Sequence, residues 1–216
     1  MGHCDWVFAN ERDRKYHDTE WGVPVHDDDR QMFEHLTLEC LQCGLSWGLM
    51  MKKREIFRRC FENFEFDRIA AYSAEDIQRI LNTEGMLKSE RKVCAAINNA
   101  KCYQKVREEF GSFCHYLWTY TDGKTIVYEG HAEGKVPVFN GLSDRISRDL
   151  KMRGFKFIGS VTIYSHLQAC GLINDHAGDC PCFHMINTAY PIIRMKPDRE
   201  IAVQTGKSIP KGDAGR

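Results

Sequence analysis

Hydrophobic residues recur along most of this chain at intervals of three and four, which is the period of an amphipathic helix. Six segments share the pattern: 32–43, 49–61, 74–81, 89–100, 143–153 and 160–172. The pattern therefore predicts a nearly all-α protein.

Small polar residues precede these segments and mark where helices begin. The predicted N-caps are Asp28 or Asp29, Ser46, Ser89, Ser143 and Ser160. Ser73 and Asp76 have the spacing of a capping box, and Gly44 is suited to end a helix as its C-terminal cap.

Three stretches lack a helical period. The aromatic N-terminal stretch up to Pro24 predicts neither a clean helix nor a strand, so another part of the chain must hold it in place. Residues 121–141 resemble a loop, with a short hairpin through 125–128. From residue 183 the pattern dissolves. We therefore expect one domain over 1–182 and a flexible tail over 183–216.

A carboxyl group, an amide and an indole lie within nine residues between the first two helices, at Glu39, Gln42 and Trp47. Glu39 follows Leu36 by three residues, which places it at the edge of the buried face. The simpler interpretation makes Glu39 a solvated helix residue and Trp47 part of the core.

Two helices joined by a short turn are predicted over about 74–110, and basic residues follow the turn. Gly85, Lys88, Arg91 and Lys92 lie near the N-terminus of the second helix, where exposed N–H groups and the helix dipole suit a phosphate. A plain antiparallel helix pair is the alternative.

Composition restricts the compartment and the partners. The 216 residues carry 30 basic and 30 acidic side chains, so the formal net charge is zero and no bulk polyanion coat is expected. No apolar run is long enough for a membrane span, and the N-terminus lacks the pattern of a signal peptide. Ten scattered cysteines without such a signal predict reduced thiols in the cytoplasm.

Soft metal ligands gather near the two ends of the chain. Cys4, His17, His176 and Cys180 form a two-cysteine, two-histidine set that suits tetrahedral zinc. Competing ligands are His3, Cys182 and His184. Four protein ligands would close the site and make the zinc structural, whereas a catalytic zinc needs an open position. The alternative is that these are ordinary Cys and His residues.

Several ordered motifs resemble those of the 3-methyladenine-DNA glycosylase I family. They are CDW at 4–6, YHDTEWGVP at 16–24, LECLQCGLSW at 38–47, KR at 53–54, KMRGFKFIG at 151–159 and QACGLINDH at 168–176. The resemblance covers roughly residues 4–182. It implies a helix-hairpin-helix fold and a structural Zn²⁺ held by Cys4, His17, His176 and Cys180.

The resemblance also implies a function: monofunctional excision of 3-methyladenine from alkylated double-stranded DNA by a monomer. Tyr16, Glu39 and Trp47 would bind the base, with Glu39 as the catalytic carboxylate that favours a cationic base over neutral adenine. The turn residues from Gly85 to Lys92 would contact the DNA backbone. No Asp occurs between Lys92 and Thr121, so reliance on a labile substrate and hydrolysis without strand cleavage are expected.

Two other function classes remain open at this stage. A non-catalytic, zinc-stabilised module could bind DNA or a damaged base, and a zinc hydrolase would need an open metal position. 3-Methylguanine is an alternative substrate, and Leu45 is one candidate for the side chain that fills the gap left by a flipped nucleotide.

Overall fold

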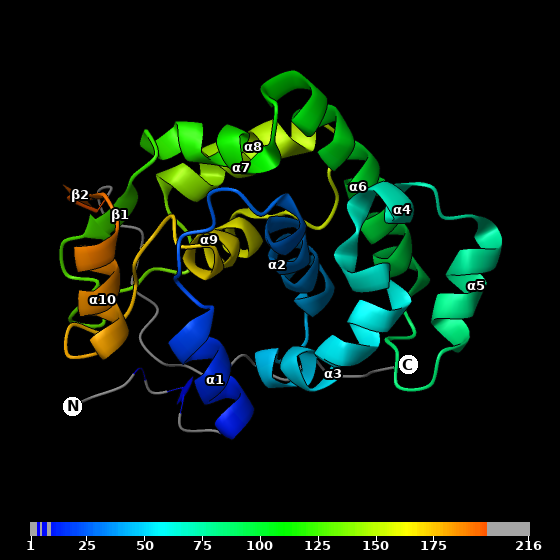
Figure 1. Cartoon of the computed structure of the whole chain (residues 1–216), viewed down its shortest axis with the longest axis horizontal. Helices are drawn as coiled ribbons and strands as arrows, with labels where there is room; N and C mark the ends of the chain where they lie inside the picture. Colours follow the sequence, from blue (N-terminus) through cyan, green and yellow to red (C-terminus); the bar gives the residue numbers. More distant parts are fainter. Residues whose placement is uncertain (1–3, 5, 8–9, 198–216) are drawn as a thin grey trace, which may run out of the picture.

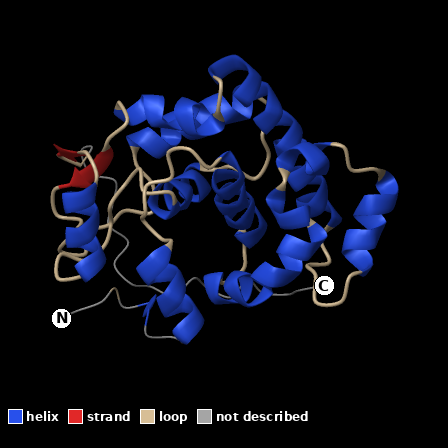
Figure 2. Ribbon diagram, in the orientation of Figure 1, coloured by secondary structure: helices blue, strands red, loops and turns tan. Residues whose placement is uncertain are grey.

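The computed structural model describes residues 4, 6–7 and 10–197, which form a mostly helical molecule with one small sheet (Figures 1 and 2). The helices are α1 (Glu11–Thr19), α2 (Asp29–Gln42), α3 (Trp47–Cys60), η2 (Glu62–Phe64), α4 (Phe66–Ala70), α5 (Ala74–Asn82), α6 (Glu90–Phe110), α7 (Phe113–Trp118), η3 (Thr119–Thr121), α8 (Gly141–Met152), α9 (Ser160–Ala169) and α10 (Pro181–Ala189). The strands are β1 (Thr125–Tyr128) and β2 (Ile192–Met195). The predicted helical class is confirmed, and the sheet is an addition to it.

Helix α2 lies at the centre of the molecule beside α9, with the other helices arranged around them (Figure 1). Every α2 residue from Met32 to Leu41 is buried, because α3, α6, α7 and α9 all contact it. A polar side chain in this part of the helix is therefore withdrawn from water whichever face it occupies.

Several predicted caps are confirmed. The side chains of Asp28 and Ser46 accept hydrogen bonds from the backbone at the starts of α2 and α3, and Ser73 with Asp76 forms a capping box on α5. Two predicted caps were wrong. Helix α9 begins at Ser160 itself, so Gly159 is its N-cap. Helix α8 begins earlier than predicted, with Asn140 as its N-cap and Ser143 as its reciprocal partner inside the first turn.

The regions predicted to be irregular contain regular structure. Helix α1 occupies the N-terminal stretch, and Asn10 caps it. The predicted hairpin is wrong, because β1 pairs in parallel with β2, with Thr125 opposite Ile192. The first part of the expected tail therefore forms α10 and β2, whereas 198–216 lie outside the described residues.

The turn between α5 and α6 packs closely on α3. Gly85 has φ +76°, a backbone conformation that favours glycine, and a Cβ there would come within 2.7 Å of Ile56 Cδ1, so the end of that side chain would have to move. None of the described helices is long and apolar enough to cross a bilayer.

Candidate active site

A cleft of about 860 Å³ opens where α1, the end of α2, the start of α3 and α9 converge. Tyr16, Glu39 and Trp47, the three side chains predicted to bind a base, all line this cleft. The structure thus brings together residues from three different helices.

Glu39 is the buried carboxyl group of the cleft. Its side chain belongs to the enclosed helix α2 and is only 6% exposed, so the interpretation of a solvated helix residue is wrong. Burial raises the pKa of Glu39 to about 8. At neutral pH the free protein therefore holds most of this carboxyl in its protonated form.

Two aromatic rings line the cleft together with Glu39. The Tyr16 ring is buried, and its centroid lies 5.4 Å from that of the half-buried Trp47. Burial raises the pKa of Tyr16, and the nearby carboxyl of Glu39 raises it further, so the phenol stays neutral. The cleft therefore offers π-faces beside a buried acid.

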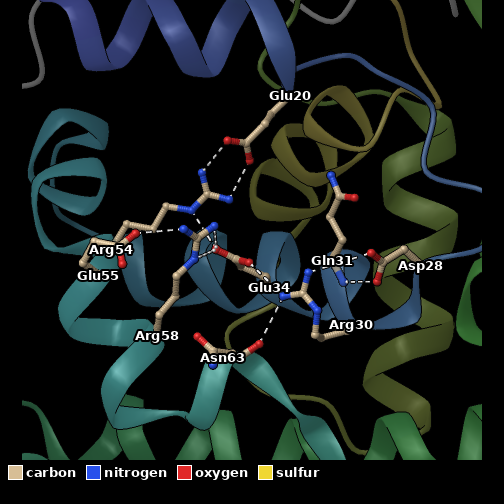
Figure 3. A network of polar contacts seen from close by, with 9 residues as sticks. All are labelled: Glu20, Asp28, Arg30, Gln31, Glu34, Arg54, Glu55, Arg58 and Asn63. Carbon is tan, nitrogen blue, oxygen red and sulfur yellow. Dashed lines mark hydrogen bonds and ion pairs between the residues drawn. The ribbon is translucent and has the colours of Figure 1, made fainter.

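A network of ion pairs fixes α1, which carries Tyr16, against α2 and α3 (Figure 3). Arg54 on α3 donates two hydrogen bonds to Glu20, at 3.0 and 2.6 Å, and one to Glu34 on α2, at 2.7 Å. Arg58 also donates to Glu34, at 2.9 Å. The Arg54 guanidinium lies 5.7 Å from the centre of the Tyr16 ring, so the network directly supports this wall of the cleft.

The four predicted metal ligands meet next to the cleft. One donor atom from each of Cys4, His17, His176 and Cys180 lies within 4.8 Å of every other. The two imidazole nitrogens are 3.1 Å apart, and the sulfur–nitrogen distances are 3.6–3.7 Å. Tetrahedral zinc with its usual bond lengths requires edges of roughly 3.3 Å between two nitrogens to 3.8 Å between two sulfurs, so the donor set is close to what Zn²⁺ needs.

Neighbouring groups orient these donors. The second ring nitrogen of His17 lies 2.7 Å from the Asp18 carboxylate, and that of His176 lies 3.1 Å from the Trp21 carbonyl oxygen. Such outer contacts hold a metal-binding imidazole in one tautomer. Among the competing ligands, Cys182 joins a second group with His17 and Asp18, and His3 lies outside the described residues.

A family model described as methyladenine glycosylase matches residues 6–184. The chain belongs to the methyladenine glycosylase family. DNA-3-methyladenine glycosylase 1 of Escherichia coli (strain K12) is 38% identical over 183 residues, which cover 85% of this chain and 97% of the relative. A protein of Haemophilus influenzae named DNA-3-methyladenine glycosylase is 37% identical, over 83% of this chain and 96% of its own.

Solved structures agree with this assignment. A crystal structure of a 3-methyladenine DNA glycosylase I has a TM-score of 0.79 and 41% identity, covering 84% of this chain and 99% of its own. A variant of such an enzyme in complex with 3-methyladenine has a TM-score of 0.78 and 34% identity, with 84% and 97% covered.

In this member of the methyladenine glycosylase family, two of the lysines predicted to contact DNA are already engaged. Lys92 donates to the carbonyl oxygens of Leu41 and Cys43, at 2.6 and 2.7 Å. Lys88 donates to the last carbonyls of α5. Arg91 lies 6.0 Å from the centre of the Phe157 ring. The lysines therefore shape the α5–α6 turn and the end of α2.

Sequence reasoning missed other residues that line the cleft. Asp13, His131 and Asp175 line it, and His131 pairs with Asp175 at 2.6 Å. Asp13 lies on the same face of α1 as Tyr16, one turn earlier. If α1 had been predicted from the sequence, Asp13 would have been a candidate cleft residue. His131 has no such signal, because only tertiary packing brings the loop after β1 to the cleft.

Proposed function

We propose that this chain is a monofunctional DNA glycosylase that hydrolyses the N-glycosidic bond of 3-methyladenine in alkylated double-stranded DNA. The observation that carries the proposal is the buried carboxyl of Glu39 in a cleft that also presents the rings of Tyr16 and Trp47. The family assignment and the names of the relatives support it.

The cleft suits a base that has left the DNA stack. An enzyme of this kind must extrude the nucleotide and hold the base between apolar or aromatic side chains. Methylation at N3 makes the adenine cationic, so each ring of Tyr16 and Trp47 adds a cation–π attraction of roughly 0.5–2 kcal/mol. The open side of the cleft admits the base from the DNA.

Glu39 selects for the charged base. In the empty cleft its carboxyl holds a proton at neutral pH, because its pKa is raised to about 8. A cationic base favours the carboxylate, which releases that proton to solvent and accepts a hydrogen bond from the exocyclic amine. Neutral adenine offers no such electrostatic gain, so binding energy distinguishes damaged from normal bases.

The bond-breaking step needs little acid–base help, since the leaving base already carries a positive charge. The electron pair of the bond between C1′ and N9 passes to the base and makes it neutral. Water adds to C1′, and its proton passes to solvent. No lysine lines the described part of the cleft, so hydrolysis without a Schiff base and without strand cleavage is the outcome we propose.

Zinc has a structural role in this proposal. Cys4, His17, His176 and Cys180 would hold it with four ligands, which leaves no open position for a catalytic water. The ion would fasten α1 to the segment before α10, and so keep Tyr16 in place. This arrangement argues against a zinc hydrolase.

The remaining parts of the proposal concern DNA and the whole chain. The α5–α6 turn, with Gly85 and Arg91, would meet the DNA backbone as a helix-hairpin-helix, while Lys88 and Lys92 hold its shape. We further propose a cytoplasmic monomer whose glycosylase domain, predicted over 1–182, continues through α10 and β2, because β2 pairs with β1. No disulfide joins any of the ten cysteines, all of which the structure describes, and this fits a reducing compartment.

The decisive experiment resolves the bases released from methylated duplex DNA by chromatography, for the wild type and Glu39→Gln. We expect 3-methyladenine from the wild type and a sharp reduction in the variant. Release that the substitution leaves unchanged would refute the role of Glu39. No release from folded, zinc-loaded wild type would refute the glycosylase and favour a binding module.

A further inference from the structure

Asp13 is a second buried carboxylate at the cleft, and the mechanism above does not use it. Its side chain lines the same cleft as Glu39, and the residue is 5% exposed. It lies three residues before Tyr16 on α1, so the two share one face of that helix.

The capping of α1 uses only part of the hydrogen-bonding capacity of the Asp13 side chain. Its backbone N–H donates to Asn10 Oδ1 at 3.0 Å, and its Oδ2 accepts from Asn10 Nδ2 at 2.8 Å. Its Oδ1 is buried and accepts no hydrogen bond in the described part of the chain. Arg12 Nε lies 3.6 Å from this oxygen, an ion pair that is longer than a hydrogen bond and that involves a largely exposed guanidinium, so Oδ1 can still accept a hydrogen bond.

The lysines and arginines near the cleft lie behind its lining, which carries acidic side chains. The described lining contains the carboxyl groups of Asp13, Glu39 and Asp175, whereas it contains no lysine or arginine. Asp175 is already paired, because it accepts hydrogen bonds from Tyr164 and Gln168 and contacts His131. Asp13 is thus a carboxylate with an oxygen left over for a ligand.

We propose that Asp13 is a specificity-determining residue, which supplies a second negative charge that favours cationic purines in the cleft. The unused Oδ1 accepts a hydrogen bond from the bound cation or faces its positive ring, while Oδ2 stays on Asn10. This inference rests on the proposed function, which supplies the ligand class. It adds to that function a second carboxylate, beside Glu39, that distinguishes bases by their positive charge.

Binding of free bases tests the inference without requiring catalysis. The probes are 3,9-dimethyladeninium, which carries a permanent positive charge, and 9-methyladenine, its neutral counterpart. Trp6, Trp21 and Trp47 line the cleft, so quenching of tryptophan fluorescence reports binding. The variants are Asp13→Asn, which keeps the size of the side chain, and Glu11→Gln, a matched loss of charge at an exposed position of the same helical turn.

We expect Asp13→Asn to weaken binding of the cation about 10- to 100-fold, the range typical of a charge-assisted hydrogen bond, and to change binding of the neutral base little. Glu11→Gln should leave both affinities unchanged. An equal loss for both probes, or a lower melting temperature with unchanged affinities, would make Asp13 a capping residue only and overturn the proposal.

The release assay separates this inference from the proposed function. If the wild type releases 3-methyladenine and Asp13→Asn still discriminates fully between the two probes, the role of Asp13 is refuted and the glycosylase function stands. If the wild type releases no base, the proposed glycosylase function is refuted. The ratio of the affinities of Asp13→Asn for the cationic and the neutral probe then still shows whether Asp13 favours a positive charge.

Discussion

The carboxyl of Glu39 shows how the surroundings of one residue can set its chemistry. Its helix is covered on every side, and burial alone accounts for the rise of its pKa to about 8. Water and charged partners would keep an ordinary glutamate ionised at neutral pH. The protein instead holds a largely neutral acid in the cleft, which in the proposed function becomes a carboxylate when the cationic base enters.

Replacement of Glu39 by glutamine should change how stability depends on pH. The unfolded chain loses the Glu39 proton near pH 4.5, whereas the folded chain keeps it until about pH 8. Between these values the folded state binds more protons, so a rise in pH lowers the contribution of Glu39 to the free energy of unfolding.

This loss should amount to a few kcal/mol and end above about pH 8. Glu39→Gln should remove it, so the variant becomes more stable relative to the wild type as pH rises from 5 to 8. Urea unfolding at several pH values measures the difference. A constant difference between the two proteins across this range would contradict the raised pKa.

At the scale of elements, the turn after α2 depends on the turn that leads into α6. Lys92 reaches from the first turn of α6 to the carbonyl oxygens of Leu41 and Cys43, which lie between Glu39 and Trp47. Satisfied carbonyls hold the end of a helix in one conformation. The segment that carries Glu39 and Trp47, which we propose to bind the base, is therefore positioned from the α5–α6 pair.

Lys92→Met should release this connection. We expect kcat/KM for base release to fall roughly tenfold or more, because a small displacement of catalytic groups is costly. Lys101→Met, at an exposed position of the same helix, is the control and should behave as the wild type. Full activity of the Lys92 variant would show that the turn keeps its geometry unaided.

The ion-pair network between α1, α2 and α3 gives a prediction about stability. Glu34 is 1% exposed, and Arg54 is its nearest cationic partner. Arg54→Met should destabilise the fold by about 3–5 kcal/mol, since it leaves a buried carboxylate with weaker partners. Chemical denaturation measures this, with the exposed Arg68→Met as a control of little effect. Equal stability of both variants would rule out a supporting role.

Some elements could be predicted from sequence because their causes are local. The caps at Ser46, Ser73 and Asp28 act within three residues, and a helical period is visible along the chain itself. Helix α1 was missed because its sequence, ERDRKYHDT, has few apolar positions and owes its place to tertiary contacts. The β1–β2 pair was missed because 63 residues separate its two strands, and neither strand signals its partner.

The site likewise contains residues that could be predicted from nearby sequence and residues whose contacts depend on tertiary packing. Glu39 and Trp47 lie close together in sequence, so their proximity could be predicted, and the motif resemblance added Tyr16. The engagement of Lys92 with carbonyl oxygens could not be predicted, because a basic residue at a helix N-terminus suits a phosphate equally well. Only the packed structure shows which group it meets.

At the scale of the whole molecule, the proposed zinc site predicts that metal and fold are lost together. We expect one zinc per chain by elemental analysis. Chelation or Cys180→Ser should lower the free energy of unfolding by several kcal/mol, because metal binding couples to folding. Cys94→Ser, outside the cluster, should retain both zinc and stability. A zinc-free protein with the melting temperature of the wild type would exclude a structural metal.

Contacts between the N-terminal and C-terminal parts of the chain also determine the order in which parts of the molecule can be completed during synthesis. Cys4 and His17 contact residues that follow them by 172 and 159 positions. A ribosome that adds 5–20 residues per second needs roughly 8–30 seconds to make such a stretch. Tyr16 leaves the ribosome early, yet its final position depends on the last helices. During synthesis, the wall that would recognise a damaged base is thus among the last parts of the molecule to be completed.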